Sequence, residues 1–210
     1  MNVKWIKFLV FLICLLPLLR LVLLGLFDGL GPNPVSHLIH STGVWSLVLL
    51  LVTLSITPLR RLFEVSQILR LRRMFGQYAF FYGLLHFLIY AWFDQYFEWQ
   101  GIWRDIMSRP FILVGFISLF FLVPMSVTST NRWVRRLGVR WWRRIHWLIY
   151  PSAFLAVLHF WLEVKRDIRE PLIYAILLGI LFLYRIGYAF LCGRTKPLLN
   201  SNQDCAGVQR

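Results

Sequence analysis

Five histidines are the residues of this chain best suited to bind a metal or a cofactor. His86, His146 and His159 lie in or beside apolar stretches of membrane-crossing length, whereas His37 and His40 lie between two such stretches. Ionisable side chains within a bilayer are costly and are therefore functional candidates by default. Because neutral imidazole is a common metal ligand, two histidines on neighbouring helices can hold a haem iron from both faces.

The composition indicates the elements that must position these histidines. Of the 210 residues, 59% are hydrophobic, compared with about 45–50% in soluble domains. The apolar residues form blocks of about 20, the length of a membrane-spanning helix. We therefore predict an all-α integral membrane protein, a six-helix transmembrane bundle over 1–192 with haem held between its third and fifth helices, and a disordered cytoplasmic tail at 193–210. The predicted helices are 5–27, 42–57, 74–93, 110–127, 145–162 and 171–191.

The net charge of +14 is distributed between the apolar blocks, which indicates membrane topology rather than nucleic-acid binding. Lysine and arginine gather at the N-terminus, after the second and fourth helices, and at the start of the tail. By the positive-inside rule, both termini are predicted to be cytoplasmic.

Several motifs are absent from the sequence. The three cysteines form no CxxC or CxxCH motif, which argues against a disulfide scaffold, a thiolate metal site and covalent haem attachment. The chain has no Gly-rich dinucleotide fingerprint, Walker motif or HExxH. No acidic residue lies deep in a span, which weakens the case for a proton-coupled transporter or an aspartyl protease.

His86 and His159 are predicted to lie at one depth in the membrane. The helices at 74–93 and 145–162 run in the same direction, and the histidines lie seven and three residues before their outer ends. At ~1.5 Å per residue the depths differ by about 6 Å, which is within the precision of predicted helix ends. We expect this pair to hold a haem iron; the alternative is that each histidine bonds to a neighbouring helix.

His146 lies 13 residues before His159, ~20 Å away along a helix axis. That position suits a second haem, or a quinone or flavin site, near the inner surface. At about 100° per residue the two side chains point about 140° apart. Either Pro151 kinks or overwinds the helix, or the two histidines serve different faces.

Arginines at the inner surface can pair with haem propionates or a flavin phosphate, because guanidinium forks suit both groups. They can equally reflect topology and anionic lipid. The outer His37 and His40 are candidates for contact with a partner or a quinone, or are solvated loop residues. The inner candidates are Arg72, Arg73, Arg143 and Arg144.

Four ordered stretches carry a family resemblance: LGPNPVSHLIHSTGVWSL (30–47), SITPLRRL (55–62), LRRMFGQYAFFYGLLHFLIY (71–90) and VTSTNRWVRRLGVRWWRRIHWLIYPSAFLAVLHF (127–160). With them the chain resembles the MsrQ (YedZ) family of the ferric-reductase-like transmembrane superfamily. This resemblance implies haem b, an FMN and a bacterial inner-membrane location. It also implies electron transfer from the quinone pool, or from a cytosolic flavin reductase, to MsrP, a periplasmic molybdopterin enzyme that repairs methionine sulfoxide.

The family's haem-associated histidines correspond to His86, His146 and His159. In the related NADPH oxidases the third helix carries two histidines 14 residues apart, but here that position is Arg72. A haem on His146 would therefore lack an opposing imidazole, and the resemblance leaves one or two haems open.

We expect a transmembrane electron-transfer subunit, and the sequence identifies no independent substrate site. Two alternatives stay open: a stand-alone membrane reductase of ferric iron or oxygen, and a haem-free membrane scaffold for the periplasmic enzyme.

Overall fold

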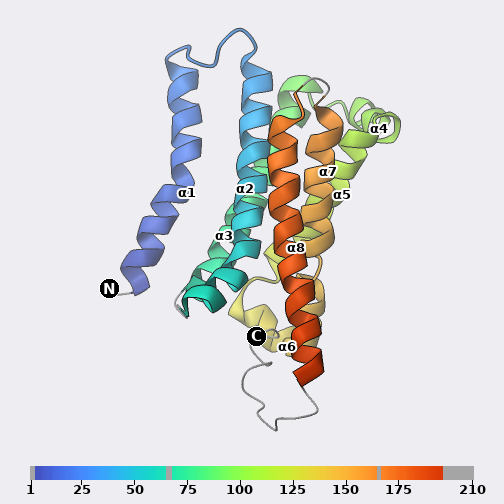
Figure 1. Ribbon diagram of the computed structural model, residues 1–210. Coiled ribbons are helices and arrows are strands. Elements are labelled where there is room, and N and C mark those ends of the chain that lie inside the picture. Colours follow the sequence, from blue (N-terminus) through green and yellow to red (C-terminus); the bar gives the residue numbers. More distant parts are fainter. Residues whose placement is uncertain (1–2, 65–67, 165–166, 196–210) are drawn as a thin grey trace.

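The computed structural model describes residues 3–64, 68–164 and 167–195, and within them all regular structure is helical (Figure 1). Residues 196–210, most of the predicted tail, lie outside the described residues. The elements are α1 (Val3–Leu26), α2 (Pro34–Phe63), α3 (Leu69–Ile89), the π-helical turn η2 (Tyr90–Asp94), α4 (Trp99–Ser108), α5 (Pro110–Val127), α6 (Asn131–His146), α7 (Ile149–Glu163) and α8 (Arg169–Thr195).

The long helices run side by side (Figure 1). One end of the bundle holds the start of α1, the end of α2, the start of α3, α6 and the C-terminal end of α8. We call it the basic end, because the predicted inner arginines lie there. Among the described residues, five helical segments are long and apolar enough to cross a membrane, which supports a multi-pass membrane protein. They are Trp5–Leu26, Pro34–Phe63, Pro110–Val127, Asn131–Glu163 and Arg169–Leu191.

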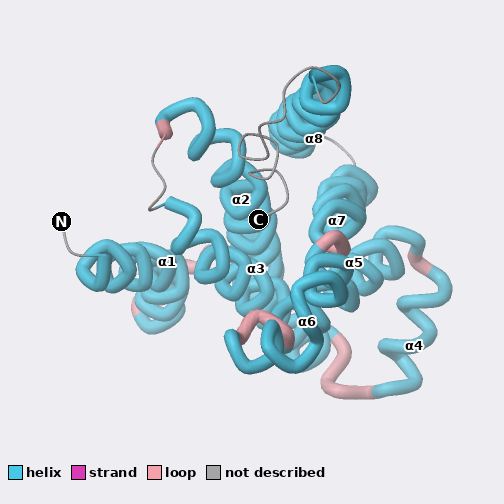
Figure 2. Tube along the Cα trace, turned by 90° about the horizontal axis from the view of Figure 1, so that it is seen from below, coloured by secondary structure: helices cyan, strands magenta, loops and turns pink. Residues whose placement is uncertain are grey.

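The third predicted membrane-spanning helix, α3, is not among these five segments. Helix length and composition therefore do not reproduce the predicted number of six transmembrane helices. Arg72, Gln77 and His86 are among the polar residues that lower its apolar character. The helix contacts α1, α2 and α5, and Figure 2 shows it between α1 and α5 beside α2. Neighbouring helices rather than lipid therefore cover much of α3, so it can carry polar residues.

Two predicted loops contain helices. In the loop predicted at 94–109, Ile102 and Ile106 repeat at a helical spacing, and both are buried against Ala91 in η2. The arginine-rich loop predicted before 145 forms α6, which is kinked at Gly138 (φ 75°, ψ 155°) and ends at His146. These loop assignments were wrong because short amphipathic helices resemble interfacial loops when only long apolar blocks are counted.

The helix predicted at 42–57 is longer at both ends. Asn33 caps it, since its side-chain oxygen accepts a hydrogen bond from the Ser36 amide at 3.2 Å, and Pro34 occupies the first turn. Both residue types favour a helix start. His37 and His40 therefore lie on α2, which corrects their assignment to a loop. At its other end α2 continues through Pro58 to Phe63.

A buried tyrosine ties α1 to α3. Tyr82 is 0% exposed, and its hydroxyl donates to the Cys14 carbonyl at 2.7 Å and accepts from the Leu18 amide at 3.1 Å. These two backbone groups flank Pro17, a residue that disrupts helical hydrogen bonding. The Tyr82 hydroxyl thus bridges α1 at its proline.

Helices α5 and α7 approach closely through two buried serines. The Ser118 hydroxyl donates to the Ser152 carbonyl at 2.9 Å, and the Ser152 hydroxyl donates to the Ser118 carbonyl at 3.0 Å. On the other side of the bundle, the Ser46 hydroxyl of α2 donates to the Ala79 carbonyl of α3 at 2.8 Å. These bonds fix the two helix pairs that enclose the site described next.

Candidate functional site

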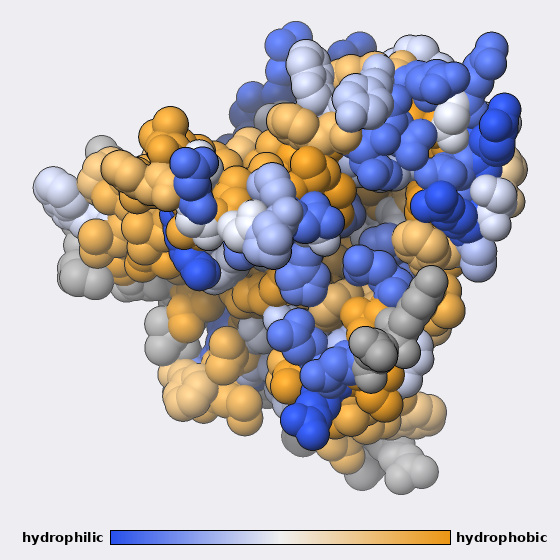
Figure 3. Space-filling model, turned by 90° about the horizontal axis from the view of Figure 1, so that it is seen from above, coloured by the Kyte–Doolittle hydropathy of each residue, from blue (hydrophilic) through white to orange (hydrophobic). Residues whose placement is uncertain are grey.

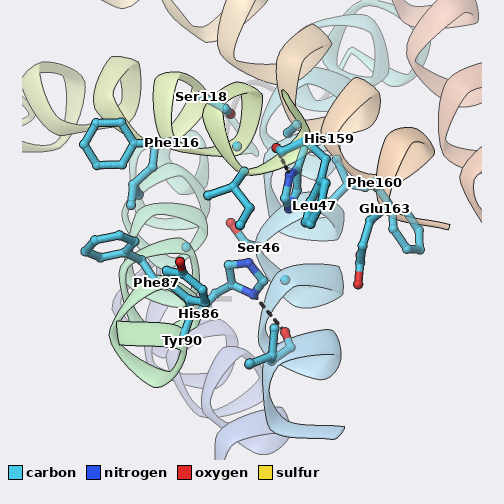
Figure 4. A pocket seen from close by; sticks show the side chains of 18 of the residues that line it. Ser46, Leu47, His86, Phe87, Tyr90, Phe116, Ser118, His159, Phe160 and Glu163 are labelled. Carbon is cyan, nitrogen blue, oxygen red and sulfur yellow. Dashed lines mark hydrogen bonds between the residues drawn. The ribbon is translucent and has the colours of Figure 1, made fainter. Parts of the chain in front are cut away.

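A cavity of about 290 Å³ lies between α2, α3, α5 and α7. Its walls are largely apolar, with side chains such as Leu47, Phe87 and Phe116 (Figure 4). Two imidazoles, His86 of α3 and His159 of α7, enter it from different helices. His86 and His159, which were predicted from the sequence to lie at one depth in the membrane, thus share one cavity.

The two imidazoles are close and nearly perpendicular, with ring centroids 6.1 Å apart and planes at 82°. The Nδ1 atom of His86 lies 2.8 Å from the Ile39 carbonyl oxygen, and that of His159 lies 2.6 Å from the Phe111 carbonyl oxygen. A carbonyl only accepts, so each Nδ1 carries the proton and each Nε2 keeps a free lone pair. Metal-ligating histidines are oriented by this kind of outer hydrogen bond.

The separation of the rings fits ligation of one iron by both. A metal–nitrogen bond of about 2 Å plus a ring radius of about 1.1 Å, taken on both sides, gives centroids about 6 Å apart. Among the described residues, no group of three or more His, Cys, Asp or Glu side chains could hold a bare metal ion. The two imidazoles would therefore suit an iron whose other ligands come from a porphyrin.

Glycines open the two carbonyls to the histidines. In a helix the Cβ of residue i+4 points back toward the carbonyl of residue i, and Gly43 and Gly115 stand four residues after Ile39 and Phe111. A Cβ on Gly43 would meet His86 Nδ1 at 3.0 Å, and a Cβ on Gly115 would meet His159 Nδ1 at 2.7 Å. Both positions require glycine because the histidine rings approach the backbone closely. A glycine four residues after a carbonyl is a pattern that could have indicated this contact from the sequence.

One side of the cavity is polar, and we call this set the polar rim: His40, Tyr90, Asp94, Arg109 and Glu163. It belongs to the end of the bundle opposite the basic end (Figure 1). Two members of the polar rim also lie near acidic residues outside it. Arg109 Nε is 3.4 Å from Asp105 Oδ1, and His40 Nε2 is 3.8 Å from Glu170 Oε2. Figure 3 shows this end from above, with hydrophilic residues gathered toward the α4 side and apolar residues over α1.

The four arginines predicted to pair with propionates or phosphate do not line this cavity. They lie at the basic end, where Arg73 donates to the Asn131 side chain at 2.7 Å and Arg144 lies 4.7 Å above the Trp141 ring. Arg109, which does line the cavity, was not singled out from the sequence. Of the two outer histidines, His40 lines the cavity and His37 does not.

His146 lies apart from this cavity, at the end of α6. Its ring stacks on Trp142 with centroids 4.0 Å apart, and its Nδ1 lies 3.0 Å from the Trp142 carbonyl oxygen. The cations that act on it electrostatically are Arg72 and Arg73. The contacts of His146 are therefore with Trp142 of its own helix, and arginines of α3 supply the nearby positive charge.

The junction between α6 and α7 resolves the predicted mismatch between His146 and His159. Pro151 has no amide hydrogen, and the Trp147 carbonyl instead accepts from the Tyr150 amide at 3.1 Å. This bond, three residues apart, tightens the chain locally. The two histidines consequently belong to separate helices, and His159 lines the cavity whereas His146 does not.

Known proteins are similar to this chain over most of its length. Residues 42–168 match the family described as "Ferric reductase like transmembrane component". A protein of Xanthomonas campestris pv. campestris (strain 8004) is 49% identical over 80% of this chain and 77% of its own length. Another, of Herminiimonas arsenicoxydans, is 42% identical over 89% of this chain and 86% of its own. Both are named "Protein-methionine-sulfoxide reductase heme-binding subunit MsrQ". No solved structure matches.

Proposed function

The chain belongs to the MsrQ family of ferric-reductase-like transmembrane proteins, and from this premise we propose that it is a haem b-containing electron-transfer subunit. One haem b is held between His86 and His159. The paired imidazoles are the observation that carries the proposal, because both Nε2 atoms are free and the rings are 6.1 Å apart. Haem supplies one-electron transfer when it is bound.

The residues of the cavity have separate tasks. Ile39 and Phe111 orient the imidazoles through their carbonyls, while the apolar walls exclude water from the iron. Arg109 is the cation best placed to meet a propionate, since it is the arginine of the polar rim. The polar rim lies at the outer surface, where an electron-accepting partner would bind.

We further propose the direction of transfer. Electrons come from the quinone pool or a cytosolic flavin reductase at the basic end and leave at the polar rim for the periplasmic molybdoenzyme MsrP, which reduces methionine sulfoxide in oxidised proteins. The chain lies in the bacterial inner membrane with both termini in the cytoplasm, as the arginines of the basic end support. An FMN at the basic end, near His146 and the arginines Arg72, Arg73, Arg143 and Arg144, would serve as the entry site.

Optical spectroscopy of the purified protein and of three single variants tests the haem assignment. We expect a dithionite-reducible b-type spectrum that is lost in both His86→Ala and His159→Ala, whereas His37→Ala keeps it because His37 does not line the cavity. Full haem content in either of the first two variants would refute the assignment. Haem-free wild-type protein that still supports MsrP would instead identify a scaffold.

A further inference from the structure

Three buried polar atoms of the described chain have no hydrogen-bond partner: Thr57 Oγ1, Arg61 Nη2 and Arg185 Nε. Thr57 and Arg61 are four residues apart on α2 and therefore share one face. Arg185 of α8 reaches the same face, because its Nη2 donates to the Leu54 carbonyl at 2.8 Å. The three unsatisfied atoms thus gather at one place, between the basic ends of α2 and α8.

The chain builds this place around a proline. Pro58 has no amide hydrogen to offer the carbonyl of Leu54, four residues earlier. Arg185 supplies the missing donor with Nη2, and its Nη1 donates to the Tyr150 hydroxyl at 2.6 Å. Its guanidinium is thereby fixed in place while Nε is left without an acceptor.

The same place concentrates positive charge. Arg185 is repelled electrostatically by Arg61 and by Arg72, and Arg61 lies 3.6 Å above the Tyr188 ring. Neither of the two ion pairs among the described residues involves these arginines. Half-buried guanidinium groups with unmet donors and no carboxylate partner are costly unless an anion is bound.

We propose that Thr57, Arg61 and Arg185 form a binding site for a phosphate group. A phosphate offers acceptor oxygens to the hydroxyl and to both guanidinium groups, and guanidinium donors bind phosphate strongly. The group is that of a phospholipid of the adjacent leaflet or of a small soluble phosphate. The site is separate from the cavity of His86 and His159, and its three residues are not among those proposed for FMN. It therefore goes beyond the proposed electron transfer and does not depend on it.

Thermal unfolding of the haem-loaded protein tests this site in dodecyl maltoside, a detergent without phosphate. The probes are phosphatidylglycerol and inorganic phosphate, with diacylglycerol as a lipid that lacks phosphate. At about 100 times its Kd, a probe raises the folded-to-unfolded ratio about 100-fold. Stabilisation by phosphatidylglycerol alone identifies a lipid headgroup, and stabilisation by inorganic phosphate as well identifies a small phosphate.

The variants Arg185→Gln and Thr57→Val are compared with Arg60→Gln, because Arg60 is a neighbouring arginine on α2 that has no buried unpartnered atom. We expect about a tenfold loss of apparent affinity in Arg185→Gln, a smaller loss in Thr57→Val and none in Arg60→Gln. Thr57→Val keeps the test valid if Arg185→Gln does not fold. Equal stabilisation of all variants, equal effects of diacylglycerol and phosphatidylglycerol, or no effect of either phosphate probe would overturn the site. The haem spectrum, recorded in the same samples, reports on the proposed function independently.

Discussion

Replacing Gly115 with alanine should displace one imidazole without removing it. The new Cβ would lie 2.7 Å from His159 Nδ1, 2.9 Å from Cε1 and 3.0 Å from Cγ, whereas ordinary contacts begin at 3.4 Å. The ring must therefore move by about 0.7 Å, and it cannot do so without disturbing its 2.6 Å hydrogen bond to Phe111. Overpacking of this kind costs about 1–3 kcal/mol.

That cost translates into weaker haem binding, because each 1.4 kcal/mol is about a factor of ten. We expect the haem affinity of Gly115→Ala to fall about 5- to 150-fold, with a weaker sixth ligand. Gly43→Ala should have a milder effect, since its Cβ would approach His86 Nδ1 only to 3.0 Å. Gly179→Ala is the matched control, because its Cβ would meet nothing within 4 Å.

The assay is haem titration of the three haem-free variants, followed by their oxidised and reduced spectra. The predicted order of haem loss is Gly115→Ala, then Gly43→Ala, with Gly179→Ala equal to the wild type. A Gly115→Ala protein with wild-type affinity and an unchanged spectrum would refute the role given to the glycine and to the position of His159.

Two further predictions concern the fold and the polar rim. Tyr82→Phe removes the hydroxyl that bridges Cys14 and Leu18, so the free energy of unfolding should fall by about 1–3 kcal/mol. Tyr78→Phe is the control and should change the free energy of unfolding less, because the Tyr78 hydroxyl lies a longer 3.4 Å from the Phe11 carbonyl oxygen. Equal thermal midpoints for the two variants would contradict this prediction. Arg109→Gln should lower the haem midpoint potential by on the order of tens of millivolts, because the loss of a positive charge favours the oxidised haem. Redox titration checks this prediction, with Arg104→Gln as the control because Arg104 does not line the cavity. Equal midpoint potentials in the two variants would remove Arg109 from the site.

The sequence predicted much of this arrangement because membrane helices leave a strong signal. Long apolar blocks located α1, α5 and α8 to within a few residues, and α5 was predicted with the bounds that the structure shows, Pro110–Val127. Depth matching also brought His86 and His159 to one level, and the structure brings their rings together.

The remaining features depend on contacts that no local pattern reports. Helix α2 continues past Pro58 because Arg185, far along the chain, satisfies the freed Leu54 carbonyl. The importance of Gly43 and Gly115 follows from histidines on other helices. Arg109 lies between α4 and α5, and it lines the cavity because both helices pack against η2. From the sequence, η2 was predicted to be the end of a membrane-spanning helix followed by a loop.

The central claim is one haem held by two imidazoles. The most direct test is electron paramagnetic resonance of the oxidised protein at a measured haem-to-protein ratio. We expect one haem per chain. Because the two imidazole rings are nearly perpendicular, at 82°, this haem should give a strongly anisotropic low-spin signal. A high-spin signal, or two haems per chain with one on His146, would contradict the account.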